Sequence, residues 1–254
     1  MSNKSDQPSM DRRNFIGGTV AAAGAITIAP GVILHAVAAS KEEPSAGASS
    51  KHRWGMVVDA NKCADGCSAC VDACNEEHNL VDHSREARPE TDAKWIRTVK
   101  LKDTQTGRIN RLVMMCQHCE FPPCVDVCPT NASFRRVDGI VLVDRHRCIG
   151  CRYCMMACPY KARSFVHEAL HDQAVSAPRG KGCVESCTLC VHRLDYGNMK
   201  TACQEACEKE GHAAILFGDL NDPQSQISQL LLKNNSTQIR ADLELNTGVR
   251  YLNL

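Results

Sequence analysis

The sequence predicts an α+β fold in which two small cysteine-rich units are nested, one inserted into the other. Of its 254 residues, 17 are cysteine, and sixteen of these form four consecutive groups of four. Short apolar stretches between the groups are typical of strands. Aromatic residues make up only 4% of the chain, so large apolar side chains supply little of its core. Such a chain needs further support, for which disulfides and bound metal are the two standard sources.

The first 39 residues are predicted to be a twin-arginine export signal. Arg12 and Arg13 precede an uncharged run from 15 to 34, and the small residues 36–39 follow it. An ordinary basic signal or an uncleaved membrane anchor is the alternative interpretation, and cleavage itself stays open. Because twin-arginine signals direct proteins that have already folded, this one indicates that a cofactor is inserted before export to the periplasm.

Residues 40–55 are predicted to form a polar linker, and residues 56–218 to form the domain that holds the cysteines. The formal net charge of the chain is +1. A nucleic-acid-binding protein should show a basic stripe, so we exclude this class of partner. No catalytic residue is assigned, because no nucleophile or acid–base motif stands out.

The segments between the cysteine groups predict short β-hairpins. Residues 95–101 and 109–115 flank a turn at 103–107 and indicate two paired strands. Residues 140–143 indicate a further short strand.

The last segment, residues 219–254, has a different character. A helix is expected from Asp222-Pro223 to about Lys233, because apolar residues there fall on one face. Residues 234–254 are polar with scattered leucines. We expect either an extended docking tail or a frayed terminus there.

The four cysteine groups are the strongest signal in the sequence. In chain order they are Cys63, Cys67, Cys70 and Cys74; Cys116, Cys119, Cys124 and Cys128; Cys148, Cys151, Cys154 and Cys158; and Cys187, Cys190, Cys203 and Cys207. The third group has the spacing C-x2-C-x2-C-x3-C followed by Pro159, which is the cluster-binding run of bacterial ferredoxins. Its two-residue gaps let a tight loop bring three thiolates to three corners of a cube. The fourth thiolate begins a helix and points to a second cluster.

The second and third groups are therefore expected to exchange their fourth cysteines. The second group also ends in Cys-Pro, and its middle gap is widened by residues 120–123. One 4Fe–4S cluster would be held by Cys116, Cys119, Cys124 and Cys158. Its neighbour would be held by Cys148, Cys151, Cys154 and Cys128.

The first and fourth groups are left as a second exchanging pair. One cluster would use Cys63, Cys67, Cys70 and Cys207. The other would use Cys187, Cys190, Cys203 and Cys74. The sixteen cysteines would then ligate the iron of four 4Fe–4S clusters in two ferredoxin-like units, an inner one from 116–158 and an outer one from 63–74 and 187–207.

Zinc and disulfides explain the same cysteines less well. Structural zinc sites use separated C-x2-C pairs, and an odd cysteine count with clustered cysteines fits a disulfide framework badly. No C-x-x-C-H is present, so covalent c-type haem is not supported. Cys183 is left over, as a spare thiol or an alternative ligand. His118 and His146 either adjust cluster potentials or are ordinary surface histidines.

These motifs resemble the four-cluster electron-transfer subunits related to the iron–sulfur subunit of dimethyl sulfoxide reductase and to NrfC. The resemblance covers about residues 54–223, including the fourth-group segment 185–193 and the segment 217–223 beyond it. The export signal and the ending 250–252 are most similar to the DsrO subfamily, the periplasmic iron–sulfur subunits of the DsrMKJOP membrane complex of sulfur metabolism. The chain departs from the family pattern in the gap between Cys63 and Cys67, which has one extra residue.

The resemblance implies several partners. They are an NrfD-type integral membrane subunit that handles quinone (DsrP-like), a multihaem cytochrome c (DsrJ-like), and DsrM-like and DsrK-like subunits. The implied function is to relay single electrons between them, without a substrate of its own. Association with the inner membrane would run through these partners. An electron-transfer subunit of a molybdenum-containing oxidoreductase is the alternative.

Overall fold

The structure, a computed structural model, describes residues 26–29, 32–34, 48–81, 86–171, 173 and 178–254. It divides the chain into two units, 1–43 and 44–254. In the first unit, β1 (Ile26–Ala29) and β2 (Val32–Leu34) form an antiparallel pair. The twin-arginine pair and the small residues 36–39 lie outside the described residues. Within the described ranges, no helix is both long and apolar enough to cross a membrane.

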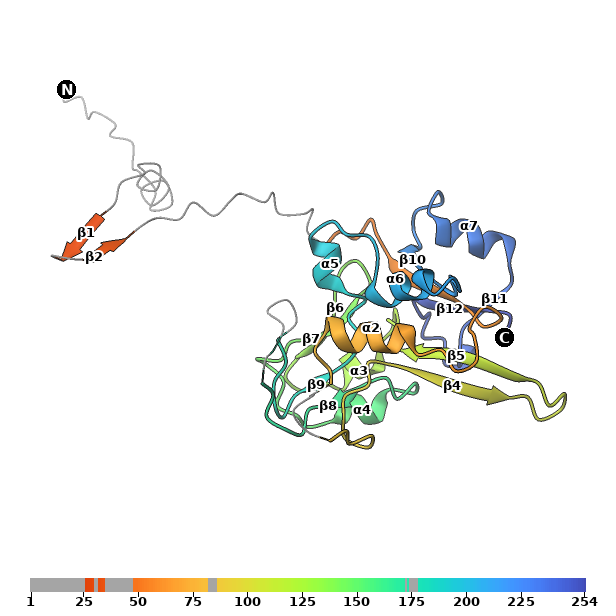
Figure 1. Cartoon of the computed structure of the whole chain (residues 1–254), viewed down its shortest axis with the longest axis horizontal. Coiled ribbons are helices and arrows are strands. Elements are labelled where there is room, and N and C mark those ends of the chain that lie inside the picture. The colour runs from red at the N-terminus through yellow and green to blue at the C-terminus, as the bar shows by residue number, and fades with distance from the viewer. Residues whose placement is uncertain (1–25, 30–31, 35–47, 82–85, 172, 174–177) are drawn as a thin grey trace, which may run out of the picture. The chain divides into compact units, whose positions relative to one another are not determined.

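A four-stranded sheet joins the beginning and the end of the second unit (Figure 1). In spatial order its strands are β10 (Ile215–Asp219), β3 (Trp54–Asp59), β12 (Val249–Leu252) and β11 (Ser236–Thr237). β3 is antiparallel to β10 and parallel to β12. The four central residues of β3 are all buried, so its sequence is continuously small or apolar instead of alternating.

The C-terminal tail belongs to this sheet, which corrects the expectation of an extended docking tail or a frayed terminus. Val249 and Tyr251 in β12 are fully buried. The Tyr251 hydroxyl accepts a hydrogen bond from Gln117 Nε2 (3.1 Å) and donates one to the Val113 carbonyl (3.1 Å). A four-residue strand among polar residues has no periodicity that the sequence alone reveals.

The helix expected at residues 222–233 forms, but it begins later than predicted. α7 spans Gln226–Lys233 and ends where the sequence indicates. Ser225 caps it, because its hydroxyl accepts a hydrogen bond from the Ser228 N–H (3.2 Å). The residues before Ser225 form a turn instead of a first helical turn.

The described part of the second unit also contains three two-stranded sheets. Their strands are β4 (Ile96–Lys102) with β5 (Ile109–Met115), β6 (Ser133–Arg135) with β7 (Val141–Val143), and β8 (Ser164–Phe165) with β9 (Val184–Glu185). The first pair confirms the predicted hairpin, and β7 confirms the short strand, each to within one residue. The β4–β5 hairpin extends beyond the neighbouring elements (Figure 1).

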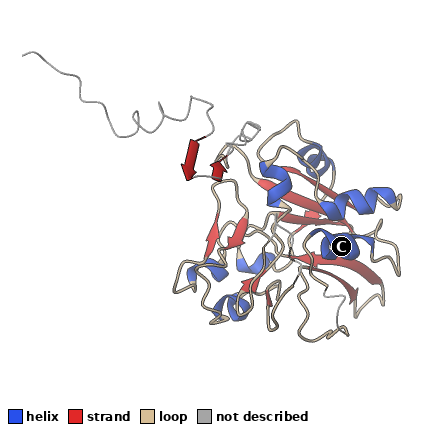
Figure 2. Ribbon diagram, turned by 60° about the vertical axis from the view of Figure 1, so that its left-hand side comes forward, coloured by secondary structure: helices blue, strands red, loops and turns tan. Residues whose placement is uncertain are grey.

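Short helices carry or flank the cysteines and give the unit its mixed α/β character (Figure 2). They are α2 (Ala69–Glu77), α3 (Pro123–Asp126), α4 (Tyr153–Ala157), α5 (Val191–Asp195), α6 (Ala202–Lys209) and the 3-10 turn η1 (Ala241–Leu243). α2 packs against α6, although more than a hundred residues separate them in the chain. Pro123 begins α3, a position where its missing N–H leaves no intrahelical bond unmade.

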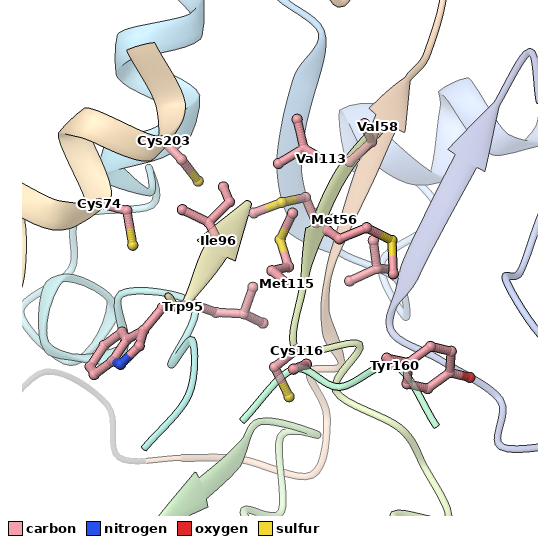
Figure 3. Packing of buried hydrophobic residues seen from close by; sticks show 14 of the residues in the cluster. Met56, Val58, Cys74, Trp95, Ile96, Val113, Met115, Cys116, Tyr160 and Cys203 are labelled. Carbon is pink, nitrogen blue, oxygen red and sulfur yellow. The ribbon is translucent and has the colours of Figure 1, made fainter. Parts of the chain in front are cut away.

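The core of the unit is built around its cysteines. Eleven of the 17 cysteines are buried, and nine of these belong to one apolar cluster together with large aliphatic, methionine and aromatic side chains. Figure 3 shows Cys74 and Cys203 projecting from neighbouring helices, with Ile96 and Met115 between them and Cys116. The small aromatic content of the sequence is thus matched by a core in which thiols occupy much of the interior.

Candidate metal centres

The loops that begin the four cysteine groups share one backbone feature. In each group the residue just before the second cysteine has a positive φ. These residues are Gly66 (83°), His118 (43°), Gly150 (71°) and Leu189 (52°). A left-handed residue reverses the chain within the gap between the first two cysteines, so that the flanking thiols face the same side. The conformation strains the two residues that are not glycine, and the surrounding packing must hold them in it.

The second group meets the last cysteine of the third group at one cavity, which we call site C. Its thiols are those of Cys116, Cys119, Cys124 and Cys158, which line one pocket. The rest of the lining consists of prolines, Gln117, Val141, Tyr160 and Arg163. The structure thus brings together the four cysteines that the sequence assigns to one cluster, including the exchanged Cys158.

The third group meets the last cysteine of the second group at a neighbouring cavity, site D. Cys128, Cys148, Cys151 and Cys154 all line this pocket. Backbone N–H groups point at two of these sulfurs. Ser133 donates to Cys128 Sγ (3.4 Å), and Val184 donates to Cys148 Sγ (3.4 Å). Burial raises the pKa of Cys128, but the hydrogen bonds from Ser133 and Thr130 outweigh it and leave this pKa below its usual value.

The packing of α2 on α6 brings the first and fourth groups together. Each helix carries two cysteines four residues apart, and these lie on the same helical face. Burial, together with the nearby thiols of Cys203 and Cys207, raises the pKa of Cys70 to about 12. Burial raises the pKa of Cys74 well above its usual value, and the thiol of Cys187 adds to this.

These neighbours define two further cysteine sets. Site A consists of Cys63, Cys67, Cys70 and Cys207. Site B consists of Cys74, Cys187, Cys190 and Cys203. Both sets are the ones that the sequence assigns to single clusters. Ala214 N–H donates to the Cys207 Sγ of site A at 3.2 Å.

The four sites lie in the order A, B, C, D. Sites A and B are neighbours because Cys70 of the first lies within electrostatic reach of Cys203 of the second. Cys187 of site B likewise interacts with Cys116 of site C. Most thiols of B and C are buried, whereas the end sites include partly exposed ones and the exposed Cys151. Solvent therefore reaches the two ends of the row more readily than its middle.

A buried cation lies between sites C and D. The Arg163 side chain is only 6% exposed, and its Nη2 donates to Cys124 Sγ at 3.1 Å. Its Nη1 donates to Ser133 Oγ at 2.8 Å. Burial lowers the pKa of Arg163, but the negative charges of the nearby thiolates, including Cys154 of site D, raise it above its usual value. The guanidinium therefore offsets thiolate charge on both sites. The sequence marks the third group as basic, but it does not show which basic residue lies between the sites.

Two buried histidines also border the sites. His118 is 2% exposed, and its Nδ1 accepts a hydrogen bond from the Val141 N–H (3.0 Å), so it is not a surface histidine. His146 is exposed. His78, which sequence analysis missed, has its Nε2 3.7 Å from Cys190 Sγ. Burial lowers the pKa of both His78 and His118 to about 3, so both rings are neutral near pH 7.

The leftover cysteine lies beside site D. Cys183 is buried, and its thiol donates to the Arg145 carbonyl at 3.3 Å. The thiol of Cys148, a cysteine of site D, interacts with it electrostatically. The structure therefore places Cys183 beside a predicted ligand of site D.

The donor type, number and spacing fit 4Fe–4S clusters. Such a cluster takes four cysteine thiolates, and each site offers four. A structural zinc ion holds each sulfur at about 2.3 Å, which leaves no space between them. The four thiols of site C, and likewise the four of site D, line one pocket each, as the ligands of one cluster would. Among the described residues, no group of three or more His, Cys, Asp or Glu is arranged around a single metal ion.

Comparison with known proteins agrees with this donor chemistry. Residues 109–219 match the 4Fe-4S dicluster domain. The chain is 40% identical over 272 residues to the Hdr-like menaquinol oxidoreductase iron-sulfur subunit 1 of Archaeoglobus fulgidus, with 96% of this chain and 98% of that protein covered.

Two further relatives match over less of their length. The menaquinone reductase iron-sulfur cluster-binding subunit of Nitratidesulfovibrio vulgaris is 32% identical over 233 residues, which cover 80% of this chain and 89% of that subunit. NrfC of Escherichia coli is 38% identical over 182 residues, which cover 70% of this chain and 71% of NrfC.

Proposed function

Since this chain belongs to the family of iron–sulfur subunits that includes those of the Hdr-like menaquinol oxidoreductase and dimethyl sulfoxide reductase as well as NrfC, we propose that it relays electrons within a DsrMKJOP-like membrane complex of sulfur metabolism. Its relatives are electron-transfer subunits of membrane-associated oxidoreductase complexes. The chain carries 4Fe–4S clusters, and its sixteen grouped cysteines suffice for four of them. DsrO is the subfamily that we propose for it.

We assign one cluster to each of the sites A, B, C and D. The cavities at sites C and D support this assignment, as does the packing of α2 on α6 for sites A and B. The proposed architecture is an inner ferredoxin-like unit that holds C and D, inserted into an outer one that holds A and B. No catalytic residue is needed, because the thiolates of the chain only ligate.

The order of the sites suggests how the protein directs electrons. Each bound 4Fe–4S cluster supplies a one-electron change of oxidation state. The chain's own residues fix the sites in a row and exclude water from sites B and C. Arg163 supplies a positive charge between sites C and D, which favours the reduced state of a neighbouring cluster. Electrons would therefore enter at one end and leave at the other.

The choice of complex rests on one observation. The match to the menaquinol oxidoreductase subunit covers 96% of this chain, whereas the match to NrfC covers 70%. The partners that we propose are a quinone-interacting NrfD-type membrane subunit (DsrP-like), a multihaem cytochrome c (DsrJ-like), and DsrM-like and DsrK-like subunits. A molybdenum-containing oxidoreductase is the alternative partner.

The location that we propose is the periplasmic face of the inner membrane. The Arg12-Arg13 pair supports export by the twin-arginine route, and the partners would hold the folded chain at the membrane. Replacement of both arginines by lysine should leave the protein in the cytoplasm with its clusters inserted. Periplasmic recovery of that variant would contradict this route.

Affinity purification from the native membrane tests the proposed function. A tagged chain should co-purify with an integral membrane subunit and a haem-containing subunit, and menaquinol should reduce its clusters within the complex. Recovery of a molybdenum-containing subunit instead would support the alternative. Clusters that no quinol reduces in the intact complex would contradict the quinone link.

A further inference from the structure

The surface around site D is strongly basic. Residues 145–163 contain five arginines and lysines and no aspartate or glutamate. Three of these, Arg147, Arg152 and Lys161, are exposed. Arg147 donates to the Thr130 carbonyl (3.1 Å), and the Arg152 guanidinium lies over the Phe165 ring at 3.9 Å. In the described part of the chain, none of the three forms an ion pair, so their charges are available to a partner.

Several carboxylates lie near this basic segment, and two of them are already paired, Glu185 with Arg179 and Asp242 with Arg240. Asp144 precedes the segment and accepts the His146 N–H through its Oδ1 (2.9 Å). Asp126 is exposed on α3, which packs against α4. They leave the surface with an excess of positive charge.

The same segment exposes large apolar side chains. Ile149 is 67% exposed, Met156 66% and Tyr153 53%. Tyr153 and Met156 are three residues apart on α4 and therefore share a helical face. A soluble protein gains nothing from such exposure unless a partner covers it, and gathered apolar residues with a polar rim are typical of interaction sites.

An exposed thiol lies within this segment. Of the 17 cysteines, all of them within the described residues, Cys151 alone is exposed. It belongs to site D, the end of the row. A partner that covers Ile149 and Tyr153 would therefore come close to a cluster held at site D.

We propose that this surface docks an acidic redox protein that exchanges electrons with site D. We call it the docking face and define it by Arg147, Ile149, Arg152, Tyr153, Met156 and Lys161. The inference rests on the proposed electron-transfer function. The partner would present carboxylates around an apolar patch above its own redox centre, so that opposite charges steer the encounter. An anionic membrane surface would match the charge, but it offers no redox centre to an exposed cluster ligand.

The opposite end of the row explains why such a partner would choose site D. Residues 59–77 around site A contain five aspartates and glutamates and one lysine. Part of this charge is neutralised, because Asp65 pairs with Lys100 and Arg111, and Glu77 pairs with Arg193. The exposed Asp72 and Glu76 still make this end less favourable for an acidic protein than the docking face, and such a difference contributes to specificity.

Stopped-flow reduction of the holoprotein by a reduced, acidic 2Fe–2S ferredoxin tests the docking face. The variant Arg147→Glu/Lys161→Glu should slow the second-order reduction by about tenfold or more at low salt and flatten its dependence on ionic strength. The control Lys102→Glu/Lys233→Glu changes the net charge equally at exposed lysines outside the docking face, and it should stay within about twofold of wild type. Equal rates in the two variants would overturn the proposal.

A neutral small reductant separates docking from damage to the clusters. Photoreduced deazariboflavin should reduce wild type and both charge variants at the same rate. If it reduces Arg147→Glu/Lys161→Glu more slowly, the variant Tyr153→Ser/Met156→Ser decides the question. In that variant, reduction by ferredoxin should be slower than in wild type, with the same dependence on ionic strength. An unchanged rate of reduction by ferredoxin would overturn the proposal.

Two results would point elsewhere. In the first, the wild-type protein sediments with phosphatidylglycerol vesicles and the Arg147→Glu/Lys161→Glu variant does not, while both are reduced by ferredoxin at the same rate. The partner of the docking face would then be a membrane surface and not a redox protein. Failure of deazariboflavin to reduce any cluster in wild type would instead contradict the proposed function itself.

Discussion

Sites A and D have the same donors and lie at opposite ends of the row, but their surroundings carry opposite charge. Five carboxylates lie within residues 59–77 at site A, and five arginines and lysines lie within residues 145–163 at site D. At site A part of this charge is used inside the molecule, because Asp65 forms ion pairs with Lys100 (3.3 Å) and Arg111 (2.5 Å). At site D the exposed cations have no such partner in the described part of the chain. The comparison teaches that equal clusters can present different surfaces to different partners.

The largest effect is expected when site A or site D loses the one cysteine that another cysteine group contributes to it. Cys207→Ser should remove the cluster of site A, and Cys128→Ser that of site D, so iron should fall from about sixteen to about twelve atoms per chain in each. The double variant Cys207→Ser/Cys63→Ser affects one site and should keep about twelve. The variant Cys207→Ser/Cys187→Ser affects two sites and should keep about eight. The reverse order of these two iron contents would contradict the exchange of ligands.

The middle of the row should depend on the C-terminal strand β12. Tyr251 is fully buried and bonded to Gln117, which lies between two cysteines of site C. Tyr251→Ala should lower the free energy of unfolding by about 3–5 kcal/mol, and Tyr251→Phe by about 1–3 kcal/mol through the hydrogen bonds alone. Thermal unfolding followed by cluster absorbance measures both. The exposed Tyr196 provides the control, and a Tyr251→Ala protein as stable as Tyr196→Ala would refute this role.

Two glycines differ in how closely other atoms pack against the cysteine loops of sites A and D. Gly66 at site A and Gly150 at site D both have positive φ. An added Cβ would meet nothing within 4 Å at Gly66, but it would lie 2.2 Å from the Gly182 carbonyl oxygen at Gly150. Gly66→Ala should therefore destabilise by about 1–2 kcal/mol, and Gly150→Ala by about 2–4 kcal/mol. Similar melting temperatures for the two variants would contradict the closer packing around Gly150.

The smallest predicted effect concerns potentials. Arg163→Gln should lower the reduction potentials of the clusters at sites C and D by roughly 60–130 mV, since a charge-assisted hydrogen bond contributes about 1.5–3 kcal/mol and 1.4 kcal/mol corresponds to 59 mV for one electron. The exposed Arg152 serves as the matched control, because solvent screens its charge. Redox titration followed by electron paramagnetic resonance measures both. A larger shift in Arg152→Gln than in Arg163→Gln would contradict the role of the buried cation.

The sequence predicted which cysteines come together better than it predicted the residues and strands that surround them. The spacing of the third group and the Cys-Pro endings are local signals, and the structure brings together the two cysteine sets that they indicate, those of sites C and D. The position of Arg163 between two sites depends on tertiary packing, so composition revealed only that the segment is basic. The strand at Val249–Leu252 is too short and too isolated in sequence to be recognised. The positive φ of Leu189 could not be expected either, because leucine rarely adopts this conformation.

The central claim is that four 4Fe–4S clusters occupy this chain in one row. Iron analysis of the purified holoprotein, combined with electron paramagnetic resonance of its reduced form, tests this most directly. The account predicts about sixteen irons per chain and signals broadened by coupling between neighbouring clusters. About four metal ions per chain, or zinc in place of iron, would contradict it.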